Sequence, residues 1–122
     1  VPDFRQARCP TRVYRGVRRG DVFTVRVLDS ALGQCGGCSL DPKASRDVMD
    51  CAAEFGWGDT GDGARQLALA LLLDVSGDAC TALKWFELFT EKYVRCLAPD
   101  WTVPELDIAL WLHCFENARP GA

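Results

Sequence analysis

Residues 55–73 decide the fold, and they read Phe-Gly-Trp-Gly-Asp-Thr-Gly-Asp-Gly-Ala-Arg-Gln-Leu-Ala-Leu-Ala-Leu-Leu-Leu. Four glycines fall within eight positions of this stretch, namely Gly56, Gly58, Gly61 and Gly63. Glycine tolerates positive φ angles and close backbone approach, so this density predicts a tight and specifically shaped turn. The turn leads directly into the most apolar run of the chain.

That run, from Ala64 to Val75, is almost entirely leucine and alanine. Leu67 and Leu71 lie on one side at helical spacing, while Leu69 and Leu73 cover the opposite side. A helix that is apolar all round is typical of a buried central helix. It is too short to span a membrane, which needs about 20 apolar residues.

The flanking sequence predicts what surrounds this helix. Alternating residues over 12–18 and 22–28, on either side of a glycine-containing turn, indicate an antiparallel β-hairpin. A second helix is expected over residues 79–97, and a capping box at residues 102–105 is expected to open a third. The prediction is therefore an α+β fold, in which an N-terminal antiparallel β-hairpin of two to three strands packs on a three-helix unit with a buried central Leu/Ala helix. The expected core residues are Leu67, Leu71, Phe86, Phe89, Ile108 and Trp111.

The length of 122 residues and 48% hydrophobic content are typical of one globular domain. We expect a flexible arm over residues 1–11, a single α+β domain over residues 12–117 and a tail over residues 118–122. There is no long apolar stretch and no apolar segment of the kind that secretory signals contain. The expectation is a cytoplasmic protein without membrane contact.

The glycine turn and the helix after it also carry a family resemblance. Matching residues are Phe55, Trp57, Gly58, Gly61, Gly63, Gln66, Leu67, Ala68, Leu69, Ala70 and Leu72. With these residues the chain resembles a family of small bacterial and phage proteins of unknown function, DUF6166, over residues 12–112. Asp59 stands where the family has an aromatic residue and Ala64 where it has proline, while Tyr14-Arg15-Gly16 looks like the opening strand. The resemblance implies a fold and a phage or mobile-element setting, but no chemistry.

The charge of the chain is unevenly distributed around its net value of −3. Residues 1–27 hold seven arginines and two acidic residues, whereas residues 28–122 hold fifteen acidic and seven basic residues. The acidic remainder favours contact with a basic partner. The predicted partner-binding residues are Asp47, Asp50, Glu54, Asp59 and Asp62. The alternative is nucleic-acid contact through the basic hairpin, at Arg12, Arg15, Arg18 and Arg19.

Seven cysteines are many for this length, and most are expected to be small buried hydrophobes. Cys35-Gly-Gly-Cys38 differs because a glycine turn holds two thiols close together. Such a pair supplies half of a zinc site, which Cys51 would extend, or a redox pair. A zinc-binding or redox module is therefore an alternative function, although no second Cys-x-x-Cys is present.

No catalytic motif is present, and the single histidine, His113, is followed by Cys114 on a predicted helix, so the two side chains diverge. We therefore expect a non-catalytic interaction protein without a cofactor. Its concrete form would be an inhibitor of a host defence complex, comparable to an anti-CRISPR protein, that binds a host nucleoprotein complex through its acidic surface.

Overall fold

A computed structural model describes residues 12–29 and 38–117 of the chain. Strands β1 (Arg12–Arg19) and β2 (Val22–Asp29) form the predicted antiparallel hairpin around a turn at residues 20 and 21. Successive side chains of a strand point to opposite faces of its sheet. Tyr14, Gly16 and Val25 are buried on one face of the hairpin, whereas the alternate residues Arg15 and Thr24 are exposed on the other face.

Two further strands flank the hairpin and give a four-stranded sheet in the order β3-β2-β1-β4. Strand β3 (Cys38–Ser39) pairs antiparallel with β2, and β4 (Trp101–Pro104) pairs antiparallel with β1. Strand β4 corrects the expectation of a capping box at residues 102–105. Trp101 and Val103 alternate into the core, so this segment is extended, and the last helix begins only after Pro104.

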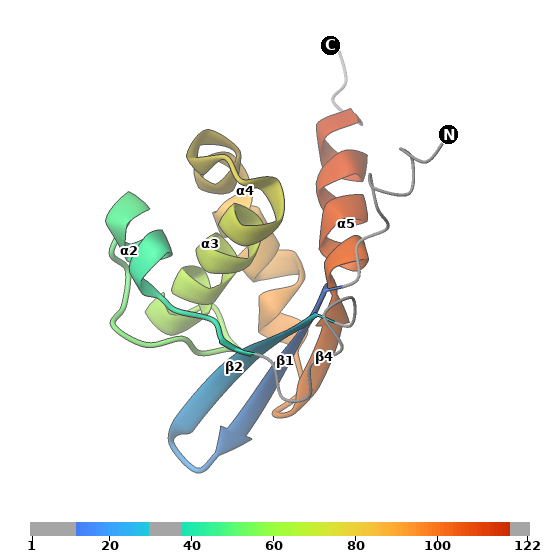
Figure 1. Cartoon of the computed structure of the whole chain (residues 1–122). Coiled ribbons are helices and arrows are strands. Elements are labelled where there is room, and N and C mark those ends of the chain that lie inside the picture. Colours follow the sequence, from blue (N-terminus) through green and yellow to red (C-terminus); the bar gives the residue numbers. More distant parts are fainter. Residues whose placement is uncertain (1–11, 30–37, 118–122) are drawn as a thin grey trace.

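The helices lie on one face of this sheet, and no helix among the described residues covers the other face (Figure 1). They are α2 (Lys43–Val48), α3 (Asp62–Ser76), α4 (Ala79–Lys92), the 3-10 helix η2 (Val94–Cys96) and α5 (Glu105–Asn117). The second predicted helix ends earlier than expected, at Lys92 instead of residue 97. Tyr93 leaves the helical conformation, and the chain tightens into η2.

Helix α3 is the buried Leu/Ala helix that the sequence predicts. Eight of its residues are buried, and it contacts α2, α4 and α5. It ends where Gly77 adopts a left-handed conformation with φ 69° and its N–H donates to the carbonyl of Leu73. Asp78 follows at once and caps α4 through a hydrogen bond from the backbone N–H of Cys80. The short connection makes α3 and α4 neighbours.

The core is close to the predicted one. Five of the six expected core residues are buried, namely Leu67, Leu71, Phe86, Phe89 and Ile108. Fully burying side chains of this size stabilises a fold by about 1.5–3 kcal/mol each. Trp111 is only partly buried, because it lies in an aromatic cluster at the edge of the core, edge-on to Trp85 and 4.3 Å from Phe115 between ring centroids.

Gly16 shows how closely the sheet approaches the core. A Cβ atom at this position would lie 2.2 Å from the indole ring of Trp101, far inside contact distance. The Trp101 ring occupies the space that a side chain at position 16 would fill. The same ring packs edge-on against Trp57, with 5.4 Å between the ring centroids. This explains the glycine at position 16 of the Tyr14-Arg15-Gly16 segment.

The predicted arm, residues 1–11, and the predicted tail, residues 118–122, lie outside the described residues. Across the described ranges, every helix is either too short or too polar to cross a membrane. The buried residues form one hydrophobic cluster that runs from Tyr14 on β1 to Leu112 on α5.

Candidate functional site

The first two predicted partner-binding residues belong to helix α2 and its end, and both are paired. Lys43 Nζ lies 3.5 Å from Asp47 Oδ2, one helical turn away. Arg46 holds Asp50 with two hydrogen bonds, at 3.0 and 3.2 Å, and hydrogen bonding to Arg46 lowers the pKa of the Asp50 carboxyl. These two carboxylates are therefore partly neutralised by their own helix.

The other three predicted acidic residues lie in the glycine turn. Glu54, Asp59 and Asp62 line a shallow hollow of about 470 Å³, together with Asp21 from the β1–β2 turn. We call these four carboxylates the acidic rim. Asp21 was not among the predicted residues, because only the fold brings the hairpin turn beside the glycine turn. The structure thus joins four acidic residues from two separate segments of the chain.

Two members of the acidic rim have local contacts. Asp59 accepts a hydrogen bond of 3.0 Å from the backbone N–H of Gly61, which shapes the turn. Asp62, in the first turn of α3, lies 3.5 Å from Arg65. Within the described residues, Asp21, Glu54 and Asp59 make no ion pair, so their charges are not neutralised by a neighbouring side chain.

Strand alternation divides the four predicted nucleic-acid-binding arginines. Arg12 and Arg18 face the helices, where Arg12 pairs with Asp74 of α3 and Arg18 lies 5.0 Å from the ring centroid of Phe23. Arg15 and Arg19 face the open side of the sheet. The four arginines therefore do not form one surface, and Arg12 is held against α3 by its ion pair with Asp74.

The open side of the sheet carries a basic residue that the prediction missed. Arg15 of β1 lies directly opposite Arg26 of β2 on this side of the sheet. Arg19 is neutralised by Asp100 at 3.3 Å. The prediction missed Arg26 because it did not include the pairing register of β1 and β2, and only this register places Arg26 opposite Arg15.

The proposed metal or redox residues are only partly described. Cys35 lies outside the described residues, Cys38 is an exposed residue of β3, and Cys51 is half-buried after α2. Burial raises the pKa of the Cys51 thiol. Within residues 12–29 and 38–117, no group of three or more potential metal ligands lies together. Zinc binding at Cys35, Cys38 and Cys51 stays a hypothesis.

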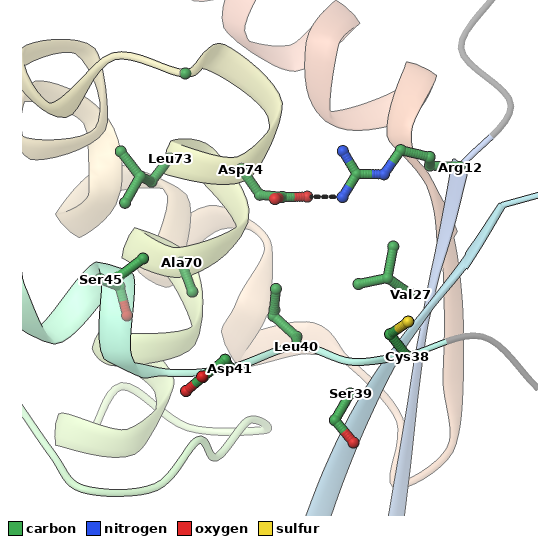
Figure 2. A pocket seen from close by; sticks show the side chains of 12 residues that line it. Arg12, Val27, Cys38, Ser39, Leu40, Asp41, Ser45, Ala70, Leu73 and Asp74 are labelled. Carbon is green, nitrogen blue, oxygen red and sulfur yellow. Dashed lines mark hydrogen bonds and ion pairs between the residues drawn. The ribbon is translucent and has the colours of Figure 1, made fainter.

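A cavity of about 700 Å³ opens between the sheet, α2 and α3, and the sequence pattern did not predict it (Figure 2). Its lining is mainly apolar, and the apolar side chains come from β2, the segment after β3, α2 and α3: Val27, Leu40, Ala44, Ala70 and Leu73. The Arg12–Asp74 ion pair lies across one side, and Cys38 and Asp41 border it elsewhere. This volume lies within the range of about 300–1,000 Å³ that is typical of small-molecule sites.

Arg12 and Asp74 line the polar side of this cavity, and the buried hydroxyl of Tyr14 holds Asp74 in place. Asp74 Oδ2 accepts hydrogen bonds from Arg12 Nη2 and from the Tyr14 hydroxyl, each at 2.5 Å. Tyr14 is fully buried, and burial, followed by its bond to Asp74, raises the pKa of its hydroxyl. The hydroxyl therefore stays protonated and keeps donating. A sequence signal for Asp74 did exist, since it is the one charged residue in the last three turns of α3.

Gln66, a residue of the family motif, forms a second polar network on α3. Its Oε1 accepts from the backbone N–H groups of Cys51 at 2.6 Å and Ala52 at 2.9 Å. Its Nε2 donates to Ser45 Oγ at 2.9 Å and to the carbonyl of Met49 at 3.2 Å. The side chain is fully buried, and it ties α2 and the segment after it to the central helix.

The sequence of the chain was compared with those of known proteins and protein families. No curated protein and no solved structure gave a significant match to the chain. A family model does match, over residues 14–114, and it spans the sheet, the glycine turn and all the helices described above. The chain therefore belongs to the family of unknown function DUF6166.

Proposed function

We propose that this protein is a non-catalytic interaction protein that binds a basic partner surface through its acidic rim. The observation that carries the proposal is the hollow lined by Asp21, Glu54 and Asp59, whose carboxylates make no ion pair within the described residues. Charges that are exposed and unpaired before binding can pair with a partner and guide its approach. Asp62 extends the same rim.

The concrete form of the proposal is an inhibitor of a host defence complex, comparable to an anti-CRISPR protein and acting in the cytoplasm of the host cell. A surface that normally holds nucleic acid is basic, because it must neutralise phosphates. Carboxylates arranged along a rigid turn compete for such a surface. The uneven charge of the chain supports this, since residues 28–122 hold fifteen acidic and seven basic residues.

The test uses purified RNA-guided nuclease complexes as probes, with DNA cleavage and co-purification as the readouts. We expect the wild-type protein to bind a complex and inhibit cleavage. The variant Asp21→Asn with Glu54→Gln removes two unpaired carboxylates from the rim and should weaken inhibition by about tenfold or more, because each rim contact contributes on the order of 1 kcal/mol. Both substitutions keep the size of the side chain.

The matched control is Glu91→Gln with Asp107→Asn, which removes the same charge from exposed positions on α4 and α5. This control should inhibit as the wild type does. Equal weakening in both double variants would show that only net charge matters. Failure of the wild-type protein to bind any complex at micromolar concentration would count against the inhibitor proposal.

Nucleic-acid binding on the open side of the sheet is the second candidate. The observation in its favour is Arg15, an exposed arginine on that side that makes no ion pair within the described residues, so its charge is available to a phosphate. Retention of labelled single-stranded RNA should then fall steeply with salt. Arg15→Gln should reduce the salt slope by about one, and Arg95→Gln, at an exposed position of η2, is the control. Salt-independent behaviour would exclude this candidate.

A further inference from the structure

The ion pair at the cavity of Figure 2 is incomplete. Arg12 and Asp74 are joined through one nitrogen and one oxygen, although a guanidinium and a carboxylate can form two parallel hydrogen bonds. Asp74 Oδ2 takes both Arg12 and Tyr14, and Asp74 Oδ1 has no hydrogen-bond partner among the described residues. The two side chains are only 31% and 28% exposed. They therefore offer an unused acceptor and unused donors at a partly buried position that a ligand can reach.

The rest of the cavity wall favours a ligand whose remaining part, beyond its polar group, is apolar. Side chains from β2, α2 and α3 supply an apolar lining, and Figure 2 shows Val27 and Leu40 beside the space that the ion pair spans. Such a surface gains free energy when an apolar group displaces water from it. The polar side offers an acceptor next to donors, which is the complement of an amide N–H next to its C=O.

We propose that this cavity binds a small, mainly apolar molecule that carries a primary amide, with the amide N–H on Asp74 and the amide carbonyl on Arg12. A free carboxylate would meet the charge of Asp74, and a free amine would meet that of Arg12. An amide satisfies both without adding charge beside either. Tyr14 acts as a positioning residue, because its hydroxyl holds Asp74 Oδ2 and leaves Oδ1 for the ligand.

The probes share one apolar body and differ in the polar group: indole-3-acetamide, indole-3-acetate and tryptamine. Calorimetry on the full chain should give saturable binding of the amide with a Kd of about 1 mM or tighter. The acetate and the amine should bind at least about tenfold more weakly, since each places a like charge at the ion pair. No saturable binding of the amide, or equal binding of either charged probe, would overturn the proposal.

Cys38 gives an independent readout, because its thiol borders the cavity. Saturating amide should slow modification of Cys38 by methyl methanethiosulfonate about fivefold or more, by mass action. The exposed thiols Cys80, Cys96 and Cys114 lie outside the cavity and are internal controls in the same sample. The experiment is done in a Cys35→Ser background. The peptide that would carry both Cys35 and Cys38 then has one thiol, and its modification reports on Cys38 alone. Equal slowing at all four sites, or none at Cys38, would contradict a site here.

Two variants locate the site. Asp74→Asn should abolish amide binding, and Asp100→Asn, which disrupts the equivalent Asp–Arg pair at the other end of β1, should leave it unchanged. If Asp74→Asn does not fold, Ala44→Phe places a bulky side chain at the cavity wall from an exposed helical position. Ala44→Phe should block binding, with Ala98→Phe as the control. Wild-type affinity in Ala44→Phe would overturn the assignment to this cavity.

Discussion

Gln66 and Asp74 lie eight residues apart on helix α3, and each connects that helix to another part of the chain. Gln66 is fully buried, and its amide makes four hydrogen bonds, so its oxygen and its nitrogen are both occupied. Asp74 is 28% exposed and uses one oxygen for both of its contacts. One network is closed, and the other has hydrogen-bonding capacity left over beside a cavity.

This difference separates a structural role from a binding role. A buried polar group must be fully paired, because every unpaired donor or acceptor costs free energy without compensation. Gln66 meets this demand and has nothing left with which to bind a ligand. Asp74 borders water-accessible space, so its unused oxygen is tolerated and remains available. The family motif contains Gln66, the centre of the closed network, and not Asp74, which is consistent with a motif that indicates a fold and no chemistry.

The largest expected effect is that of Gln66→Leu. The substitution puts an apolar side chain of similar size in place of the amide and removes the partner of the backbone N–H groups of Cys51 and Ala52. It also removes the donor to Ser45 Oγ and to the carbonyl of Met49. We expect a loss of about 2–4 kcal/mol in the free energy of unfolding. Urea unfolding followed by circular dichroism measures it.

Ser45→Ala is the control for that variant, because it removes only one of the four partners of Gln66. Its expected cost is about 1 kcal/mol. If Gln66→Leu cost no more than Ser45→Ala, the network would not be a closed unit, and the contrast with Asp74 would fail.

Tyr14→Phe should have a smaller effect at neutral pH and a distinctive one at alkaline pH. Loss of the hydroxyl removes one hydrogen bond to Asp74, at a cost of about 1 kcal/mol. Burial raises the pKa of Tyr14 above its ordinary value. The unfolded chain therefore loses this proton near pH 10 while the folded chain retains it, and wild-type stability falls above about pH 10.

Below about pH 10 the Tyr14 hydroxyl is protonated in both states, so its ionisation makes no difference there. Tyr14→Phe should therefore lose part of the alkaline decline in the free energy of unfolding. The chain has two tyrosines, and Tyr93→Phe is the control. Tyr93 is half-buried and stacks on Phe89 at 4.9 Å, and burial raises the pKa of its hydroxyl as well. An unchanged alkaline slope in Tyr14→Phe would contradict a protonated, donating hydroxyl.

The sequence predicted the parts of the fold that depend on local pattern. The Leu/Ala periodicity of α3, the glycine turn and the alternation in the hairpin each follow from residues close in the chain. Strand β4 was missed because Thr102 and Glu105 match a capping pattern, while its pairing with β1 depends on residues more than 80 positions away. Long-range pairing leaves little trace in one sequence.

The same reason limits what could be predicted of the sites. Asp59 and Asp62 stood out as neighbours, but Asp21 joins them only through the fold. The arginines of β1 were read as one group, and strand alternation separates Arg12 from Arg15. The cavity at Asp74 forms only where β2, α2 and α3 come together in the fold. Residue type identified candidates, and tertiary contacts decided which of them act together.

A kinetic test of the closed network uses Cys51, whose backbone N–H donates to Gln66. Its thiol is half-buried, and burial raises its pKa, so at pH 8 it should react with iodoacetamide more slowly than the exposed Cys80 and Cys96. Gln66→Leu should bring the rate of Cys51 closer to theirs. Mass spectrometry of the separate peptides measures these rates. Equal rates in the wild-type protein would show that this segment opens freely.

The smallest effect is expected at the exposed pair of Arg46 and Asp50, which has good geometry but no burial. Two hydrogen bonds join these side chains, and their bond lowers the pKa of Asp50, so any contribution is present at neutral pH and is lost as acid protonates the carboxylate. Water and salt screen such a pair, so Asp50→Asn should leave the urea midpoint at pH 7 unchanged within error. A decrease as large as that of Tyr14→Phe would mean that pairing alone, without burial, stabilises this protein. The distinction between Gln66 and Asp74 assumes that a polar contact contributes to the free energy of unfolding mainly where water is excluded. That result would contradict the assumption, and the distinction would need another physical basis.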